Sequence, residues 1–356
     1  MIRLSEVKKG GIELKSIQEM LSIVAQRKGS DLHLITNVVP TMRINGTIKS
    51  FEENLMVMEP AESDTLAQEI LNNYQFKQLR DRGDADASYS CKSILEDKIL
   101  RARVNVFKDY RGLSFAFRLI SDKIPTMQDL MLPLGLRNLT NRKHGFIAIT
   151  GPTGSGKTTT LAAMLNSINE TQYGNIITLE DPIEYIYPIK CSIISQREIG
   201  QNCVSFAEGL KASLRQDPNV IFVGEMRDAE TIATALSAAE TGHLVLTTLH
   251  TANVIEAVDR MLQYFPAEQQ QRMQSELANC FLGIVAQKLI PKKTGNGRVA
   301  AFEVLLKTPA TEKLIRNGEA FQLKNYMRSE YGMITMEKAL TDLQNRGLIQ
   351  TDYQQV

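Results

Sequence analysis

The 356-residue sequence has no tryptophan, only four cysteines and only four histidines. The cysteines stand singly, at positions 91, 191, 203 and 280, without a C-x-x-C pair. This spacing argues against a structural zinc site and a disulfide framework, and it is typical of reduced thiols in the cytoplasm. The sequence also lacks a signal peptide at its start and an apolar run of the ~18 residues that a membrane helix needs. If the protein works at a membrane, we expect another protein to hold it there.

An excess of charge of one sign is lacking as well, since 41 basic residues balance 40 acidic ones. A nearly neutral chain has no general attraction for nucleic acid or for an anionic membrane, so either role would require a local patch. The length fits about two domains, and the hydrophobic fraction of 43% is that of an ordinary globular protein. The composition therefore predicts two hydrophobic cores.

The most informative stretch runs from Gly145 to Leu161, where an apolar strand leads into a glycine-rich turn that opens a helix. The turn matches the pattern G-x-x-x-x-G-K-[ST] in full, and its glycines let successive backbone N–H groups face a phosphate. Lys157 adds a positive charge and Thr158 a hydroxyl for Mg²⁺, whereas an ordinary strand, turn and helix would have no use for that lysine. We therefore predict a nucleotide triphosphate site formed by Gly151, Pro152, Thr153, Gly154, Ser155, Gly156, Lys157, Thr158 and Thr159.

The residues before this motif indicate a smaller domain that mixes helices and strands and has no phosphate motif of its own. Asn45-Gly46 predicts a tight hairpin turn within residues 42–48, and Pro125 ends a linker over residues 121–125. The spacing of apolar residues predicts helices over 12–26 and 60–79, and strands over 32–35, 87–91, 101–107 and 113–119.

Two strands of this smaller domain, residues 101–107 and 113–119, carry arginine. Alternation places Arg101, Arg103 and Arg118 on the faces opposite to the apolar side chains. Such a face is usually a solvated surface. The phosphate site elsewhere in the chain gives these arginines a second possible partner.

After the glycine-rich turn, strands and helices alternate. The predicted strands end in polar residues and are otherwise apolar, which is the pattern of a parallel α/β sheet that binds its ligand at the carboxyl ends of its strands. The strands are expected over 176–179, 219–223 and 244–249, and the helices over 207–214, 254–264, 268–282, 310–316 and 336–346.

Carboxylates follow two of these strands. An NTPase needs a carboxylate to orient or deprotonate the attacking water, and Glu225 is placed for this task. Gly224 stands where such strands usually carry an aspartate for Mg²⁺, so we expect the metal ligand to come from another strand. Glu180 is our candidate, supported by Asp181 and Glu184, and the alternative is that the last two only cap helices.

Two of the four histidines, His243 and His250, frame the strand 244–249. They lie at opposite ends of it and therefore cannot bind one metal ion together. His250 is expected at the same sheet edge as Glu225, where a histidine can sense the γ-phosphate or form an inter-strand hydrogen bond.

Four ordered motifs resemble those of the type II/IV secretion ATPase superfamily. They are the P-loop, an aspartate box at 178–184, a Walker B region at 214–219 and 223–228, and a histidine box at 241–250. Within that superfamily the chain is most similar to the type IV pilus retraction ATPases, the PilT family. The resemblance covers nearly the whole chain.

The resemblance implies an α/β protein with a PAS-like α+β N-terminal domain, residues 1–121, and a RecA-like P-loop ATPase domain with C-terminal helices, residues 122–356. It implies ATP and Mg²⁺ as cofactors and a homo-hexamer in which Arg103 and Arg118 approach bound nucleotide. It also implies that Glu225 is the catalytic carboxylate and that His243 and His250 are the histidine-box pair.

The same resemblance implies a cytoplasmic motor, peripheral at the inner membrane, that powers pilus retraction and twitching motility. Its partners would be an inner-membrane pilus platform protein and other pilus motor ATPases, without direct contact to nucleic acid. Three alternatives stay open: a pilus assembly or type II secretion ATPase, a RecA-like DNA motor, and a nucleotide-binding regulator without turnover. Assembly and secretion ATPases usually carry a further N-terminal domain and a tetracysteine zinc module, so retraction is favoured.

Overall fold

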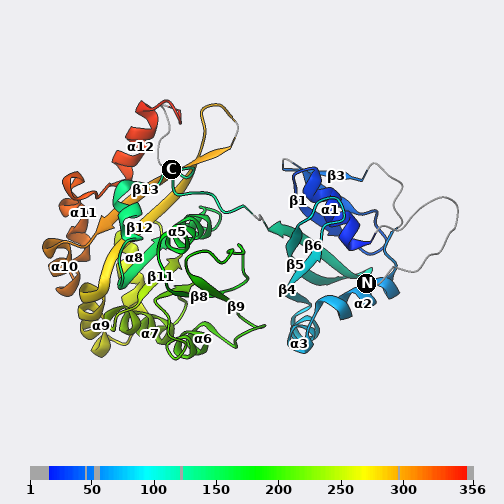
Figure 1. Ribbon diagram of the computed structural model, residues 1–356, viewed down its shortest axis with the longest axis horizontal. Helices are drawn as coiled ribbons and strands as arrows, with labels where there is room; N and C mark the ends of the chain where they lie inside the picture. Colours follow the sequence, from blue (N-terminus) through cyan, green and yellow to red (C-terminus); the bar gives the residue numbers. More distant parts are fainter. Residues whose placement is uncertain (1–15, 45, 52–56, 121–122, 296, 351–356) are drawn as a thin grey trace. The chain divides into compact units, whose positions relative to one another are not determined.

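A computed structural model of the chain describes residues 16–44, 46–51, 57–120, 123–295 and 297–350 (Figure 1). The chain divides into two compact units, residues 1–122 and 123–356. Each unit is built on a sheet of its own, with six strands in the N-terminal unit and seven in the C-terminal unit. Among the described residues, one hydrophobic core fills the N-terminal unit and three lie in the C-terminal unit, so the prediction of two cores was too low.

The N-terminal unit is an antiparallel sheet with three helices. Its elements are α1 (Ile17–Gln26), β1 (Gly29–Leu34), β2 (Thr41–Ile44), β3 (Thr47–Ser50), α2 (Pro60–Ile70), α3 (Asn73–Arg82), β4 (Asp84–Lys92), β5 (Ile99–Asp109) and β6 (Gly112–Ile120). The strands lie in the order β3-β2-β1-β6-β5-β4. Apolar side chains of all three helices share one core with one face of the sheet, so the helices cover that face.

The alternation predicted for β5 is confirmed, because Ala102, Val104 and Val106 are fully buried. Arg103 on the other face is partly exposed, and it stands opposite Arg118 in the register of β5 and β6. The two arginines therefore form an adjacent pair on the face of the sheet away from the core.

The helix predicted over residues 60–79 was wrong, because the structure has two helices there. Leu71 is extended, and Asn72 begins α3 with a capping box in which its side chain and that of Gln75 bond each other's backbone N–H groups. Asparagine is one of the preferred residues at the N-terminal cap of a helix, so a new helix begins at this position instead of the first helix continuing. The first predicted helix begins with a similar box at Ser16, and its predicted residues 12–15 lie outside the described residues, as does Asn45 of the predicted hairpin turn.

The C-terminal unit alternates strands and helices. Its elements are α4 (Leu134–Leu139), β7 (Gly145–Thr150), α5 (Lys157–Thr171), β8 (Asn175–Glu180), β9 (Ile193–Glu198), α6 (Phe206–Ser213), β10 (Val220–Val223), α7 (Ala229–Glu240), β11 (Leu244–Leu249), α8 (Val254–Gln263), α9 (Ala267–Cys280), β12 (Phe281–Pro291), β13 (Arg298–Leu306), α10 (Pro309–Arg316), α11 (Leu323–Tyr326) and α12 (Met336–Asn345). The strands lie in the order β13-β12-β7-β11-β10-β8-β9, parallel except for β13. The predicted parallel α/β sheet is thus confirmed.

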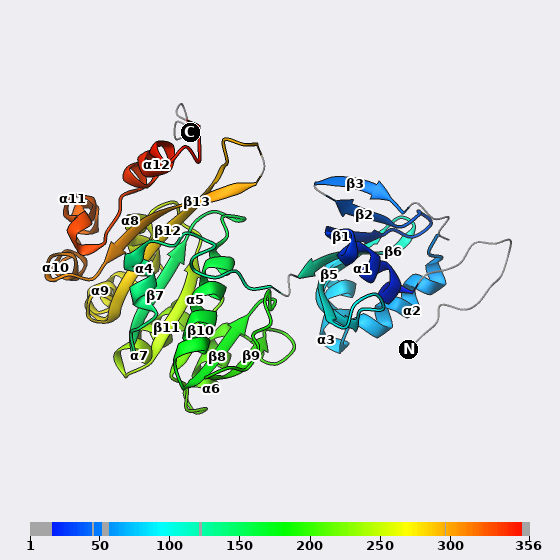
Figure 2. The same ribbon diagram turned by 45° about the horizontal axis from the view of Figure 1, so that its top comes forward.

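Helices cover both faces of this sheet (Figure 2). Strands β7, β10 and β11 are buried at every residue, as their uninterrupted apolar sequences require. One core joins the sheet to α4 and α5, and another joins it to α6, α7, α8, α9 and α10. This layering leaves the carboxyl ends of the parallel strands to form a single edge, where β7, β8, β10 and β11 end side by side.

The helix predicted over residues 268–282 ends earlier, at Cys280, because Phe281 is extended and begins β12. The sequence analysis had no strand here, nor at β9 or β13. These strands depend on hydrogen bonds to β7, β8 and β12, which lie far away in the sequence.

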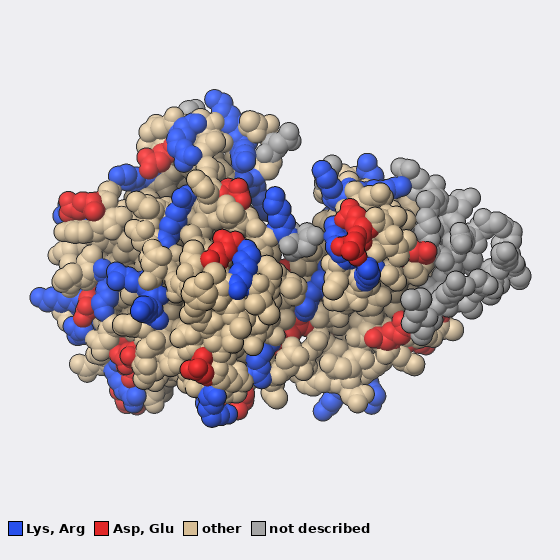
Figure 3. Space-filling view, viewed as in Figure 1, with Lys and Arg blue, Asp and Glu red and all other residues tan. Residues whose placement is uncertain are grey.

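The surface carries charges of both signs. Figure 3 shows lysine and arginine interspersed with aspartate and glutamate over the viewed face of each unit, in agreement with the balanced composition. Within the described ranges, no helix is long and apolar enough to cross a membrane.

Candidate functional site

A glycine-rich turn joins β7 to the first residue of α5. Gly151, Gly154 and Gly156 have φ angles of 153°, 77° and 85°, which other residues rarely adopt. A β-carbon on Gly151 would also lie 2.4 Å from the carbonyl oxygen of Gln287, so only glycine fits there. The turn therefore has the conformation that directs backbone N–H groups at an anion near a helix N-terminus.

Two polar side chains of the turn fit a phosphate ligand. The Lys157 amine donates to the carbonyl oxygens of Gly151 and Pro152, at 2.9 and 3.1 Å. Ser155 is only 3% exposed, and its hydroxyl has no hydrogen-bond partner in the part of the chain that the structure describes. A buried hydroxyl without a partner is unfavourable, and a phosphate oxygen beside the turn would satisfy it. The residues present thus fit a nucleoside polyphosphate.

Gln287 of β12 supports the turn and was not predicted from the sequence. Its amide nitrogen donates to the carbonyl oxygen of Ser155 at 2.7 Å, and its amide oxygen accepts from the hydroxyl of Thr160 at 2.8 Å. The side chain is buried, so these bonds are shielded from water. No local pattern marks this glutamine, because its role follows from the pairing of β12 with β7.

Glu225, just after β10, lies among three cationic or potentially cationic side chains. Its two carboxylate oxygens lie 2.7 Å from Nη2 of Arg227 and 3.4 Å from Nε2 of His250. Burial would raise the pKa of Glu225, but the hydrogen bond and charge of Arg227, with the charges of His250 and Lys157, hold it below its ordinary value. Glu225 is therefore an ionised carboxylate at neutral pH, close enough to the P-loop lysine for their charges to interact.

The two histidines of the histidine box are placed differently. His250 lies at the carboxyl end of β11, and burial together with the charge of Lys157 lowers its pKa, so its ring is charged only at acidic pH, where Glu225 titrates. His243 precedes the strand, and its Nδ1 lies 3.0 Å from the carbonyl oxygen of Ala238 in α7. Since β11 runs for six residues, or about 20 Å, between them, the structure brings His250 but not His243 to Glu225.

The carboxylates expected to serve the metal lie at the end of β8. Glu180 is buried and accepts hydrogen bonds from the hydroxyl of Thr178 at 2.7 Å and from the amide of Gln196 at 3.1 Å. Burial raises the pKa of Glu180 to about 7. Asp181 and Glu184 are exposed. Within the described residues, no group of three or more acidic, histidine or cysteine side chains is placed to hold a metal ion.

The two arginines of the N-terminal unit pair with acidic residues of the same unit. Arg103 lies 3.1 Å from Asp86, and Arg118 lies 2.9 Å from Asp31. The side chain of Arg118 is nevertheless 74% exposed, so it remains accessible to another anion. Arg43 also lies 3.6 Å from Asp31, which would keep that buried carboxylate paired if Arg118 moved.

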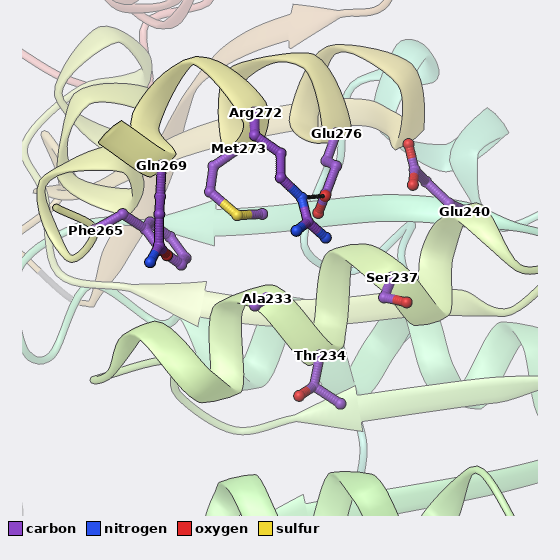
Figure 4. A pocket seen from close by; sticks show the side chains of 9 residues that line it. All are labelled: Ala233, Thr234, Ser237, Glu240, Phe265, Gln269, Arg272, Met273 and Glu276. Carbon is purple, nitrogen blue, oxygen red and sulfur yellow. Dashed lines mark hydrogen bonds and ion pairs between the residues drawn. The ribbon is translucent and has the colours of Figure 1, made fainter. Parts of the chain in front are cut away.

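A groove of about 440 Å³ lies between α7 and α9 (Figure 4). Ala233 and Ser237 line it from α7, Met273 and Glu276 from α9, and Arg272 pairs with Glu276 at 2.7 Å. None of the predicted site residues lines this groove.

Comparisons with known proteins show the family of the chain. The profile of the family described as "Type II/IV secretion system protein" matches residues 6–308. The "Type IV pilus retractation ATPase PilT" of Pseudomonas aeruginosa is 39% identical, over 94% of this chain and 95% of its own length. A "Twitching motility protein" of Neisseria gonorrhoeae is 40% identical, over 87% of this chain and 82% of its own length.

A solved structure shares the whole architecture. The crystal structure of the pilus retraction motor PilT with bound ADP superposes with a TM-score of 0.86 at 40% identity, covering 95% of each chain. The fold is thus that of a family of ATP-hydrolysing enzymes. The chain belongs to the type II/IV secretion system protein family, and within it to the P-loop ATPases of the pilus retraction type.

Proposed function

We propose that this protein is the ATP-hydrolysing subunit of a motor that retracts type IV pili. One observation carries the proposal: the P-loop and an ionised Glu225 lie at the same edge of the sheet. The P-loop contributes Lys157 and the Ser155 hydroxyl, which has no hydrogen-bond partner among the described residues. The names of the pilus retraction and twitching motility relatives, which match most of this chain, supply the biological task.

In the proposed reaction, the P-loop N–H groups and Lys157 hold the phosphates of ATP, and Glu225 orients a water in line with the γ-phosphorus. The water oxygen forms a bond to phosphorus while the bond from phosphorus to the leaving oxygen of ADP breaks, and the water proton passes to Glu225. Lys157 would exchange its two carbonyl partners for phosphate oxygens and so stabilise their charge.

Mg²⁺ neutralises phosphate charge when it is bound. We infer that the Thr158 hydroxyl in the first turn of α5 holds it, with Glu180 and Asp181 at the end of β8 acting on its water ligands. The hydrogen bonds that Glu180 accepts fix its orientation, which suits an indirect role.

We further propose a homo-hexamer in which Arg103 and Arg118 of the N-terminal unit serve the nucleotide of a neighbouring subunit. The PAS-like domain would span residues 1–121 and the RecA-like domain residues 122–356. Both arginines lie on the sheet face that the core does not use, and each is exposed enough to change partners. A cation beyond Lys157 would stabilise the charge on the transferring phosphoryl group.

The proposed partners are the inner-membrane platform protein of the pilus and other pilus motor ATPases. The protein would work in the cytoplasm and reach the membrane only through that machine. A DNA motor is disfavoured, because such proteins present a basic stripe, whereas both charge signs occur over the viewed surface (Figure 3).

The proposed function is tested by two measurements. Phosphate release by the purified chain should require Mg²⁺ and ATP and should not increase when DNA is added. Deletion of the gene in its host should leave pili that extend but do not retract, and the wild-type gene should restore retraction where Glu225→Gln does not. A deletion strain with normal retraction and no other pilus ATPase able to replace the chain would exclude the retraction role.

A further inference from the structure

Both oxygen atoms of the Glu225 carboxylate are engaged by other side chains. Oε2 accepts a hydrogen bond from Arg227 at 2.7 Å, and Oε1 faces His250 at 3.4 Å. Arg227 lies in the short connection between β10 and α7, and the sequence analysis gave it no role. A general base must turn a lone pair toward its water, and the hydrogen bond from Arg227 both holds the carboxylate in place and lowers its affinity for a proton. The geometry around Glu225 is therefore that of a restrained base.

We propose that Arg227 is a positioning residue that restrains Glu225, and that ATP hydrolysis requires this ion pair to open. The inference rests on the proposed function, because it takes Glu225 as the base. The Arg227 side chain is 65% exposed, so the pair is accessible to water and to counterions. Ion pairs with one exposed partner stabilise little, which suits a contact that opens and closes in each catalytic cycle.

The charges around this pair give Arg227 a second partner. Besides Glu225, the carboxylate of Asp181 at the end of β8 raises the pKa of Arg227. The groups whose charges act on Glu225 are Arg227, His250 and Lys157. When Arg227 turns from Glu225 toward Asp181, His250 still orients the carboxylate through Oε1, and Oε2 is free to accept the water proton.

Removal of Arg227 should therefore have two effects on Glu225. It frees Oε2 for the water, and it raises the pKa of the carboxyl, because the hydrogen bond and charge of Arg227 hold that pKa down. Only the ionised carboxylate can act as the base, so activity falls when the pH drops below the pKa of Glu225. A raised pKa therefore moves this fall, the acid limb of the pH–activity profile, to higher pH. A residue with a purely structural role would not move this acid limb.

The experiment compares ATP turnover of the full-length wild type, Arg227→Gln and Arg227→Lys between about pH 5 and pH 8. In Arg227→Gln, we expect kcat to rise about two- to five-fold, since a weak ion pair no longer opposes the reaction. The acid limb should move to higher pH, and KM for ATP should stay unchanged because the P-loop is intact. Arg227→Lys keeps a positive charge, so its kcat and its acid limb should lie between those of the wild type and those of Arg227→Gln.

The matched control is Arg272→Gln, which removes an arginine–glutamate pair of the same length in the groove between α7 and α9 (Figure 4). It should leave kcat and the acid limb unchanged. If kcat of Arg227→Gln is equal to or lower than that of the wild type, the restraint does not exist. The same conclusion follows if Arg272→Gln increases kcat over the wild type as much as Arg227→Gln does. Should Arg227→Gln fail to fold, the same criteria apply to Arg227→Lys.

Glu225→Gln separates this inference from the proposed function. If Glu225→Gln keeps wild-type turnover, Glu225 is not the base, and the proposed mechanism and the restraint fail together. If Glu225→Gln is inactive but Arg227→Gln has wild-type kcat, only the restraint fails.

Discussion

The amide of Gln287 donates a 2.7 Å hydrogen bond to the carbonyl oxygen of Ser155, across 132 positions of sequence. This bond fixes the P-loop from the neighbouring strand, because Ser155 stands at the centre of the turn and Gln287 is buried in β12. The same amide accepts from Thr160 in the first turns of α5, so one side chain ties the turn and the helix together. The conformation that binds phosphate is thus held in place before any ligand arrives.

Gln287→Glu should weaken ADP binding about ten-fold or more, since a carboxylate facing the Ser155 carbonyl repels it and leaves a buried charge beside the phosphates. Gln287→Met, of similar size, loses both hydrogen bonds without adding charge and should weaken binding less. A fluorescent ADP analogue gives the two Kd values, with Gln269→Glu in the groove between α7 and α9 as the control. Wild-type affinity in Gln287→Glu would mean that the turn keeps its shape unaided.

Glu225→Gln keeps the size of the side chain and loses its charge, so it should bind ATP and fail to hydrolyse it. Loss of a positioned general base typically costs about 10²-fold or more in rate. Nucleotide binding and phosphate release should therefore separate in this variant, with Kd close to that of the wild type. Turnover near the wild-type rate would show that another group activates the water.

The local part of the site could be predicted from sequence. The glycine pattern, Lys157 and the carboxylate after an apolar strand all lie within short continuous segments, and a parallel sheet gathers such strand ends at one edge. The prediction of where His243 and His250 lie on β11 also depended only on strand geometry. Short-range patterns were therefore enough to predict which strand ends lie at this edge of the sheet.

The rest of the site depends on distant pairing. Gln287 lies on β12, whose start the sequence pattern assigned to a helix, and β12 is a strand because it pairs with β7. The partner of Arg118 is Asp31, 87 positions away on β1. The contact between Arg227 and Glu225 is local, but no pattern shows which of several polar residues near a strand end turns toward the carboxylate.

Glu180 should make the stability of the protein depend on pH. Burial raises its pKa from the ordinary 4.5 to about 7, so the folded state binds a proton more tightly than the unfolded state. Stability is then greatest below pH 4.5 and falls as the pH rises to 7, by at most about 3 kcal/mol. Glu180→Gln stays neutral, so its unfolding temperature should exceed that of the wild type at pH 8 and approach it near pH 4. Equal pH profiles without nucleotide and Mg²⁺ would show that Glu180 keeps an ordinary pKa.

The metal dependence of turnover tests the carboxylates at the end of β8. Loss of a group that orients a metal's ligands commonly costs about 10-fold or more in affinity, so Glu180→Ala should raise the Mg²⁺ concentration for half-maximal activity by that factor. Asp181→Ala is expected to do less, and Glu170→Ala, at the far end of α5, should do nothing. If neither strand-end variant changes the Mg²⁺ dependence, the ligand lies elsewhere.

The proposal of shared active sites predicts that two inactive variants restore each other. Arg118→Ala and Glu225→Gln should each be nearly inactive alone, because every site then lacks either the arginine or the base. In a mixed ring, an intact Glu225 from the arginine variant can meet an intact Arg118 from the glutamate variant. With equal amounts and random order, at most about a quarter of the interfaces are complete, since each needs two specified neighbours.

The mixture is prepared by unfolding and refolding the two variants together, and native mass spectrometry of differently tagged chains confirms that mixed hexamers form. Phosphate release should then rise above that of either parent and should fall on dilution as rings dissociate. Two differently tagged batches of Glu225→Gln, mixed in the same way, control for effects of refolding. Asp31 keeps Arg43 at 3.6 Å when Arg118 is removed, so Arg118→Ala should fold. Mixed rings that are as inactive as their parents would mean that Arg118 acts within its own subunit or only in folding, because complete interfaces between neighbours would then be present without activity.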